Sequence, residues 1–354
     1  MFALAAGLMW GLVFVGPLLL PEYPATLQSF GRYLAFGLIA LPLGWFDRDK
    51  LRQLSRADWV EALKLALVGN IVYYLFLASA IQRAGGPLPT MIIGTLPVVI
   101  AITAKLRTAG AGARAEAPMP WLKLLPSLLL IAIGIGLVNH VELDHLKADP
   151  NADMVRYAWG GLLAVGAVAC WTWYPIRNAE WLRAQPDRSP RGWATTQGLA
   201  TLPIALVGYA LTWMWSAWID PGALASASVA AGSAASAAIG AVPVASVSGA
   251  ASATAFAMPF GPRPAQFLLL MFAIGLFASW LGTLCWNEAS QRLPPALAGQ
   301  LIVFETLAAL SYAFVLRGRA PEVETLVGVA LLIAGVVWAV RTQPEAASAE
   351  AHPN

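Results

Sequence analysis

The feature that most constrains this chain is a series of uninterrupted apolar blocks, each about as long as a helix that crosses a bilayer. A helix of about 20 residues spans the roughly 30 Å hydrocarbon core of a membrane. Only 12% of the 354 residues are charged and 58% are apolar, whereas soluble domains carry about 25% charged residues. A water-soluble globule is therefore excluded, and the chain is predicted to be a polytopic membrane protein.

The apolar runs predict an all-α protein with ten transmembrane helices. The runs are continuous, whereas the strands of a membrane barrel alternate in polarity over about 10 residues. The expected helices span residues 2–20, 27–45, 60–81, 88–104, 122–139, 157–176, 193–215, 266–286, 296–316 and 323–340. The first is expected to be an uncleaved helix, because it has neither a preceding basic residue nor a following cleavage site.

Basic residues gather in alternate connections, which predicts the orientation of the chain. Those after the second, fourth and sixth expected helices share one side: Arg48, Lys50, Arg52, Arg56, Lys105, Arg107, Arg114, Lys123, Arg177, Arg183, Arg188 and Arg191. Up to the sixth helix, the other side offers only Arg83, Lys147 and Arg156. The positive-inside rule therefore places the first set and both termini in the cytoplasm, with the chain in the cell inner membrane. The acidic segment 141–156 is expected to be an external loop.

Residues 217–264 differ in composition from the rest of the chain. They are rich in Ala, Ser and Gly, a composition typical of flexible linkers, and we expect an external insert. The alternative is an eleventh helix around residues 229–251. The tail, residues 342–354, is expected to be disordered.

A repeated motif suggests that the chain has two related halves. AIQR at Ala80–Arg83 matches ASQR at Ala289–Arg292, and LLIA at Leu129–Ala132 matches LLIA at Leu331–Ala334. These matches pair helices 1–5 (residues 1–140) with helices 6–10 (residues 157–341). An odd number of spans per half forces the halves to insert with opposite orientation, an architecture used for alternating-access transport. An eleventh helix would make the halves parallel.

The sequence also resembles the EamA type of the drug/metabolite transporter superfamily. The resemblance is carried by a set of motifs along the chain: Trp10-Gly11, Arg32-Tyr33, Pro97, LPPALAGQLIVFE at Leu293–Glu305, and the glycine spacing from Gly328 to Gly335. It implies ten helices and the export of a small solute, such as an amino-acid-like or amphipathic metabolite.

Candidate substrate-binding residues lie on equivalent faces of repeat-related helices. Asn70, Tyr73, Tyr74 and Leu77 share a helical face, and the repeat offset relates them to Ser279, Gly282, Thr283 and Trp286. Aromatic candidates are Trp10 and Phe14 in the first helix and Trp171 and Tyr174 in the sixth. Packing between helices explains such residues equally well, and most of the 15 tryptophans are expected to be interfacial anchors.

Glu305 is the one acidic residue expected near the middle of a membrane helix. An ionised carboxylate there costs on the order of 3 kcal/mol, so it should be protonated or meet a cation. Arg32 is the only basic residue well inside a span. Glu305 is therefore predicted to act as a substrate-linked or proton-coupling carboxylate. The alternative is a structural role, as a buried hydrogen bond between helices or an ion pair with Arg32.

Other chemistry has little support in the sequence. Cys170 and Cys285 lie in apolar segments, and neither a Walker P-loop nor an HExxH or GxSxG motif occurs. We therefore expect no catalytic residue, metal, cofactor or nucleic-acid partner; the expected partners are a small solute, the bilayer and, for coupling, protons. The alternatives are a structural or sensory membrane protein, or a membrane-embedded enzyme using a cluster of His140, Glu142, Asp144 and His145.

Overall fold

The structure, a computed structural model, describes residues 1–100, 102–103, 121–148, 153–219, 258–293, 301–318 and 321–341. Over these ranges the chain is helical, with no strand, and this confirms the predicted all-α class. Residues 220–257 and 342–354 lie outside the described ranges. The insert, the eleventh-helix alternative and the tail therefore remain predictions.

The helical elements follow the apolar blocks of the sequence. Those before the acidic segment are α1 (Phe2–Gly11), η1 (Leu12–Phe14), α2 (Val15–Leu19), α3 (Ala25–Phe46), α4 (Arg48–Leu51), α5 (Arg56–Lys64), η2 (Leu65–Val72), α6 (Tyr73–Ala84), α7 (Pro87–Ile93) and α9 (Trp121–Ala148). Those after it are α10 (Met154–Ala184), α11 (Pro190–Ile219), α13 (Pro264–Ile274), η3 (Gly275–Leu281), α14 (Gly282–Arg292), α16 (Val303–Arg317) and α17 (Val323–Arg341).

Five of the described helices or runs of joined helices are long and apolar enough to cross a membrane. They span Phe2–Leu19, Arg56–Ala84, Met154–Ala184, Pro190–Ser216 and Pro264–Arg292. Shorter apolar helices cover Leu88–Ile100, Leu125–Leu137, Phe304–Leu316 and Val323–Gly335. Large apolar side chains such as Leu269 and Val315 are exposed on the outside, as expected of a surface that faces lipid.

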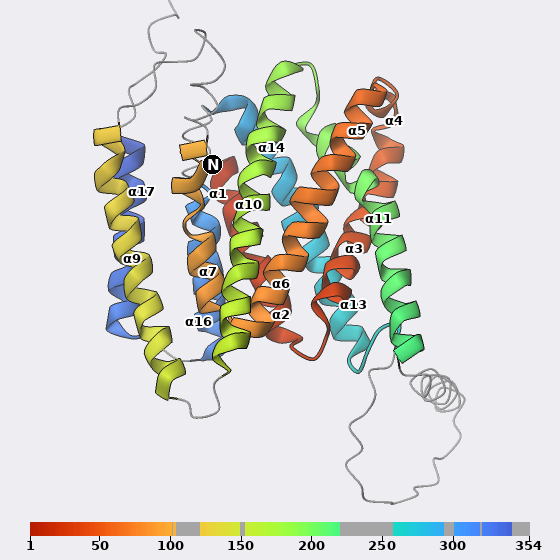
Figure 1. The fold of residues 1–354 in the computed structure, drawn as a ribbon. Coiled ribbons are helices and arrows are strands. Elements are labelled where there is room, and N and C mark those ends of the chain that lie inside the picture. The colour runs from red at the N-terminus through yellow and green to blue at the C-terminus, as the bar shows by residue number, and fades with distance from the viewer. Residues whose placement is uncertain are drawn as a thin grey trace, which may run out of the picture.

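The helices pack in pairs taken from distant parts of the sequence. α9 packs along α17 at one edge of the bundle, and α3 packs along α11 toward the other edge (Figure 1). Between them, α1 contacts α14 and α16, while α10 contacts α6 and α7. Most of the buried core lies among these central helices.

The two ends of the bundle are distinguished by the helices that begin or end there (Figure 1). We call one the α5 end: it holds the N-terminus, the start of α5 and the end of α14, and Met1 and Arg341 line the same pocket there. We call the other the α13 end: it holds the end of α6 and the start of α13. The run from α5 to α6 therefore points opposite to the run from α13 to α14.

Both of these runs contain a π-helical segment. η2 separates α5 from α6, and η3 separates α13 from α14. π-Helical segments are rare and often occur at functional sites. They were not predicted from the sequence, because the apolar pattern of a π-helical turn differs little from that of an α-helix.

The acidic segment 141–156 is partly helical instead of forming only a loop. α9 continues to Ala148 and α10 begins at Met154. The difference arises because polarity marks where a chain leaves the membrane, whereas a helix can continue into water. His140 pairs with Asp144 one turn later, at 3.2 Å, on this extension.

Candidate functional site

Glu305 is fully buried between three helices. Its Oε1 accepts a hydrogen bond from the Tyr73 hydroxyl at 3.1 Å, and its Oε2 accepts one from the Trp171 indole at 2.9 Å. The donors come from α6 and α10, whereas Glu305 lies in α16. Both carboxylate oxygens therefore have neutral donors, as a buried carboxyl group requires.

Glu305 lies in the first turn of α16, directly after a turn at Ile302 that separates α16 from the helical residue Leu301. Its expected place near the middle of a span stays a prediction. Residues 294–300, the start of the expected span, lie outside the described ranges. A carboxylate in a first turn is favoured by the positive end of the helix dipole, which lowers the cost of burying it there.

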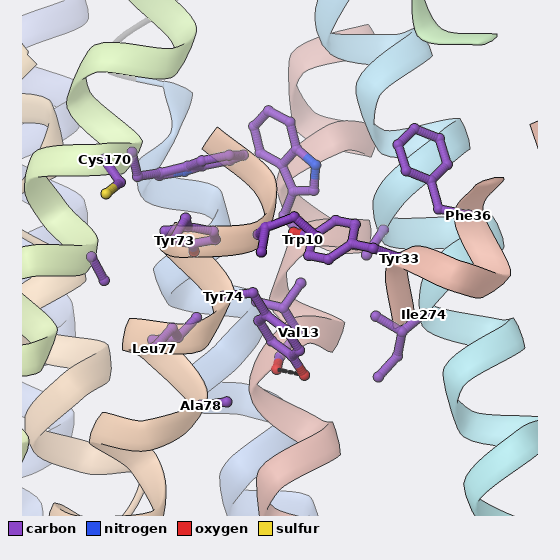
Figure 2. Packing of buried hydrophobic residues seen from close by; sticks show 14 of the residues in the cluster. Trp10, Val13, Tyr33, Phe36, Tyr73, Tyr74, Leu77, Ala78, Cys170 and Ile274 are labelled. Atoms are coloured by element: carbon purple, nitrogen blue, oxygen red, sulfur yellow. Dashed lines mark hydrogen bonds between the residues drawn. The ribbon is translucent and has the colours of Figure 1, made fainter. Parts of the chain in front are cut away.

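Five aromatic side chains, two of which bind this carboxylate, contact one another in series. We call them the aromatic cluster: Trp10, Tyr73, Trp171, Tyr174 and Trp286. The Trp171 ring stacks on Tyr73 at 4.5 Å and on Tyr174 at 5.0 Å between centroids. Trp10 packs against Trp171 at 4.9 Å and against Trp286 at 5.2 Å. Figure 2 shows Trp10 and Tyr73 in this packing. Helices α1, α6, α10 and α14 thus contribute to one set of touching rings.

Two glycines allow the rings to lie this close to the neighbouring helices. A Cβ atom on Gly69 would stand 2.1 Å from the Tyr174 ring, and one on Gly282 would stand 2.7 Å from Trp10 Nε1. Both distances are far inside van der Waals contact. Any larger residue at either position would force the ring to move.

Arg32 is also buried in the centre, but it does not meet Glu305. Its Nε donates a hydrogen bond to Ser279 Oγ at 3.0 Å, and its guanidinium lies over the Tyr33 and Tyr74 rings at 4.8 and 4.5 Å. Among the described side chains, no ion pair joins Arg32 to Glu305, so the predicted pair is not formed. The neutral donors already on both Glu305 oxygens remove the need for it.

The other predicted residues have separate neighbours. Tyr74 donates a hydrogen bond to the Val13 carbonyl at 3.1 Å, drawn as a dashed line in Figure 2. Thr283 lies beside the Tyr174 hydroxyl. Phe14 and Asn70 are buried in η1 and η2. All the predicted binding residues are thus buried near the centre, where the six residues of Glu305 and the aromatic cluster contact one another directly.

A polar chain that the sequence did not predict connects the aromatic cluster to the α5 end. Tyr174 donates to Gln197, whose amide donates to Asn178 at 3.1 Å. The Asn178 amide nitrogen donates to Asn287, and its oxygen also accepts from Trp193, both at 2.8 Å. These residues come from α10, α11 and α14. The only signal in the sequence was amide side chains within apolar runs.

The described residues offer no obvious place for a metal. Among the residues that the structure describes, no three His, Cys, Asp or Glu side chains come together as metal ligands would. The alternative cluster around His140 is represented there by the His140–Asp144 pair, since the side chains of Glu142 and His145 lie outside the description.

Comparison with known proteins gives one family. The profile of the EamA-like transporter family matches residues 1–109. The inner membrane protein YtfF of Escherichia coli (strain K12) is 50% identical over 345 residues, which cover 98% of this chain and 95% of that protein. A crystal structure of a protein with 16% sequence identity superposes with a TM-score of 0.60 over 96% of each chain, a likeness of fold alone. The chain therefore belongs to the EamA-like transporter family, within the drug/metabolite transporter superfamily.

Proposed function

We propose that this membrane transporter exports a small organic solute by alternating access between two inverted five-helix halves, residues 1–140 and 157–341. The family indicates a transporter rather than an enzyme. The observation that carries the proposal is Glu305, a buried carboxyl group that accepts hydrogen bonds from Tyr73 in one half and Trp171 in the other. A solute bound at this junction would contact both halves at once.

The repeated motif supports the relation between the halves. Gln82 and Gln291 hold the same place in AIQR and ASQR. The Gln82 amide donates to the Tyr23 carbonyl in the turn before α3, and the Gln291 amide donates to the Arg188 carbonyl in the turn before α11. These two bonds lie at opposite ends of the bundle. Equivalent residues thus make equivalent contacts in opposite directions, as inversion requires.

The helix contacts support the same relation. Under the proposed pairing, contact of α1 with α14 corresponds to that of α10 with α6, and contact of α1 with α16 corresponds to that of α10 with α7; all four occur. η2 and η3 also occupy corresponding places. In inverted-repeat transporters the two halves exchange conformations, so that a central site opens to each side in turn.

The distribution of charge supports an orientation. Many of the basic residues predicted to share one side, including Arg56, Arg177 and Arg188, belong to the helix termini at the α5 end. The positive-inside rule then places this end and both termini in the cytoplasm of the cell inner membrane. The α13 end, which carries Arg83 and Arg263, would face out. Export is the movement from the first end to the second.

Reconstituted vesicles test the function directly. Proteoliposomes loaded with a cytosolic metabolite extract should release at least one component, chemically unchanged, faster than protein-free liposomes do. Glu305→Gln should abolish or strongly reduce this release, because the amide adds donors where two donors already point. Glu288→Gln, in a pair with Arg292 away from the cluster, is the matched control and should release normally. Release of chemically altered compounds would favour the enzyme alternative, and absence of any release would count against transport.

Proton coupling is tested with the same pair of variants. If Glu305 carries protons, release by the wild-type protein and by Glu288→Gln should depend on an imposed pH gradient, whereas the release that remains in Glu305→Gln should not. Release by Glu305→Gln that is unchanged in rate and in pH dependence would remove the carboxyl group from the coupling mechanism.

A further inference from the structure

We propose that Arg32 binds the carboxylate of the transported solute, so that the solutes of this carrier are organic carboxylates. The assignment rests on the transport function proposed above and names its substrate class. It is carried by hydrogen-bond donors in the centre of the protein that have no acceptor.

The Arg32 guanidinium is held in place but only partly satisfied. The side chain is 4% exposed, and its Nε is used by Ser279. Its Nη1 is completely buried without a hydrogen-bond partner, and the described residues supply no acceptor to Nη2 either. The two terminal nitrogens form the fork of parallel N–H groups that fits both oxygens of a carboxylate.

Arg32 also has no ion-pair partner among the described residues. The Tyr33 and Tyr74 rings lie over the guanidinium and stabilise the cation through their π-electrons. No described acidic side chain comes within ion-pair distance of it. A buried cation without a counter-ion is costly. An arriving anion would remove that cost.

Glu305 does not fill this role. Its two oxygens accept from Tyr73 and Trp171. Arg32 attracts it only at longer range, without a direct contact. The central region therefore contains one charged group whose partners are present and one whose partners are missing.

A second unpaired donor lies in the aromatic cluster itself. The indole Nε1 of Trp286 is buried and has no acceptor. Arg32 Nη1 and Trp286 Nε1 are both donors, so a ligand that satisfies these two must bring acceptor oxygens. Gln28 Oε1, one turn before Arg32 in α3, is an unpaired acceptor. The helical run that carries Trp286 also carries Ser279, the hydrogen-bond partner of Arg32, so both donors border the same run of η3 and α14.

The charge balance favours a carboxylate over a phosphate. A phosphate monoester carries about −1.5 to −2 charges at neutral pH, and sites for it usually combine several cationic or backbone donors. Here the described central region supplies one guanidinium. A single negative charge matches it, and the surrounding rings of the aromatic cluster can contact the apolar remainder of the solute.

Matched triplets of compounds test the assignment in proteoliposomes. The vesicles are loaded with leucine, phenylalanine, threonine and lysine, together with the carboxamide and the decarboxylated amine of each. Release is followed by mass spectrometry against protein-free vesicles. The wild-type protein should release one or more of the amino acids at least tenfold faster than the corresponding amide and amine, which differ from it only at the carboxylate.

Two substitutions separate recognition from folding. Arg32→Gln should reduce release of the amino acids to the protein-free level. Arg32→Lys keeps the charge without the fork, and should lower release by about tenfold because one point charge replaces the bidentate contact. Arg83→Gln is the control, since Arg83 is exposed and donates only to Ser79 of its own helix. Size-exclusion profiles and unfolding temperatures identify which variants are folded.

The outcomes are distinguishable. Equal release of amino acids, amides and amines by the wild-type protein would overturn the carboxylate assignment while leaving transport intact. Wild-type release rates in a folded Arg32→Lys or Arg32→Gln protein would overturn the role of Arg32. Failure of the wild-type protein to release any component would overturn the assignment together with the function on which it rests.

Discussion

The α5 end and the α13 end are built on one plan but closed by different interactions. At each end a glutamine of the repeated motif, Gln291 or Gln82, donates to a carbonyl of the turn that precedes α11 or α3. Around this common bond the charged residues differ in number and in burial. The glutamine bonds are shared by the two ends, whereas the ion pairs around them differ.

Buried acids close the α5 end. Asp58 is completely buried and accepts from Arg188 at 2.7 Å, while Glu61 accepts from the Nη2 of Arg177 at 3.0 Å. Both acids belong to α5, whereas Arg177 lies in α10 and Arg188 lies in the turn before α11. The two ion pairs therefore join the proposed halves.

A buried tyrosine and a partly exposed ion pair close the α13 end. Tyr23 donates to the Phe260 carbonyl at 2.8 Å and accepts from the Arg263 amide at 2.8 Å. Its ring stacks on Phe267 at 4.8 Å. The ion pair of Arg263 with Glu22 is partly exposed to solvent.

The difference in burial between the ion pairs indicates which end is harder to open. Breaking a buried ion pair costs several kcal/mol because a charge loses its partner, on the order of 3–5 kcal/mol. Breaking an exposed pair costs about 0–1 kcal/mol because water then solvates both charges. We therefore expect the α5 end to be the more firmly closed in this conformation. Three substitutions test this difference, and they are given in order of decreasing loss of stability.

Asp58→Asn should have the largest effect. It removes the negative charge that faces Arg188, and it replaces one of two acceptor oxygens by an amide donor. The capping box that Ser55 and Asp58 form at the start of α5 is weakened as well. Loss of one partner of a buried ion pair costs about 3–5 kcal/mol in unfolding free energy. Thermal unfolding in detergent should show the loss, and Asp49→Asn, at an exposed acid, should leave the unfolding temperature unchanged. An equally stable Asp58→Asn protein would show that the pair does not secure this end.

Tyr23→Phe should have an intermediate effect. The substitution removes the hydroxyl that bonds Phe260 and Arg263 but keeps the ring that stacks on Phe267. Loss of such hydrogen bonds costs about 1–2 kcal/mol. The same unfolding assay measures it, with Tyr312→Phe, whose hydroxyl bond to Leu8 is exposed, as the control. A loss as large as that of Asp58→Asn would contradict the difference between the ends.

Glu22→Gln should have the smallest effect. The Glu22–Arg263 pair is partly exposed, and such pairs contribute about 0–1 kcal/mol. High salt should remove what little stabilisation the pair gives, so wild type and variant should unfold together in 1 M salt, where the screening length is about 3 Å. A persistent difference in salt would mean that the pair is more deeply buried than the structure indicates.

The sequence rules that selected the candidate residues are simple, and several of the selected side chains meet in the structure. Helical spacing and the repeat offset selected Trp10, Tyr73, Trp171 and Trp286, and these side chains meet in the structure. Glu305 was selected by the cost of a carboxylate inside an apolar run. Each of these signals is local or repeats at a fixed distance along the chain.

The partners of those residues could not be predicted in the same way. Which donor reaches Glu305, or which amide reaches Asn178, depends on how helices from distant parts of the chain pack. The sequence does not mark Asp58 and Glu61 as buried, because it does not show that arginines of the other half pair with them. For the contacts at the two ends of the bundle, the sequence offered only the repeated motif with Gln82 and Gln291.

The central claim, that two inverted halves share the site at Glu305, is tested most directly by the sides of the membrane on which Arg83 and Arg292 lie. In a protein whose two native cysteines are replaced, Arg83→Cys and Arg292→Cys are labelled in intact cells with a membrane-impermeant thiol reagent. The account predicts labelling of the first from outside, and labelling of the second only after the membrane is opened. Labelling of both positions from the same side would contradict it.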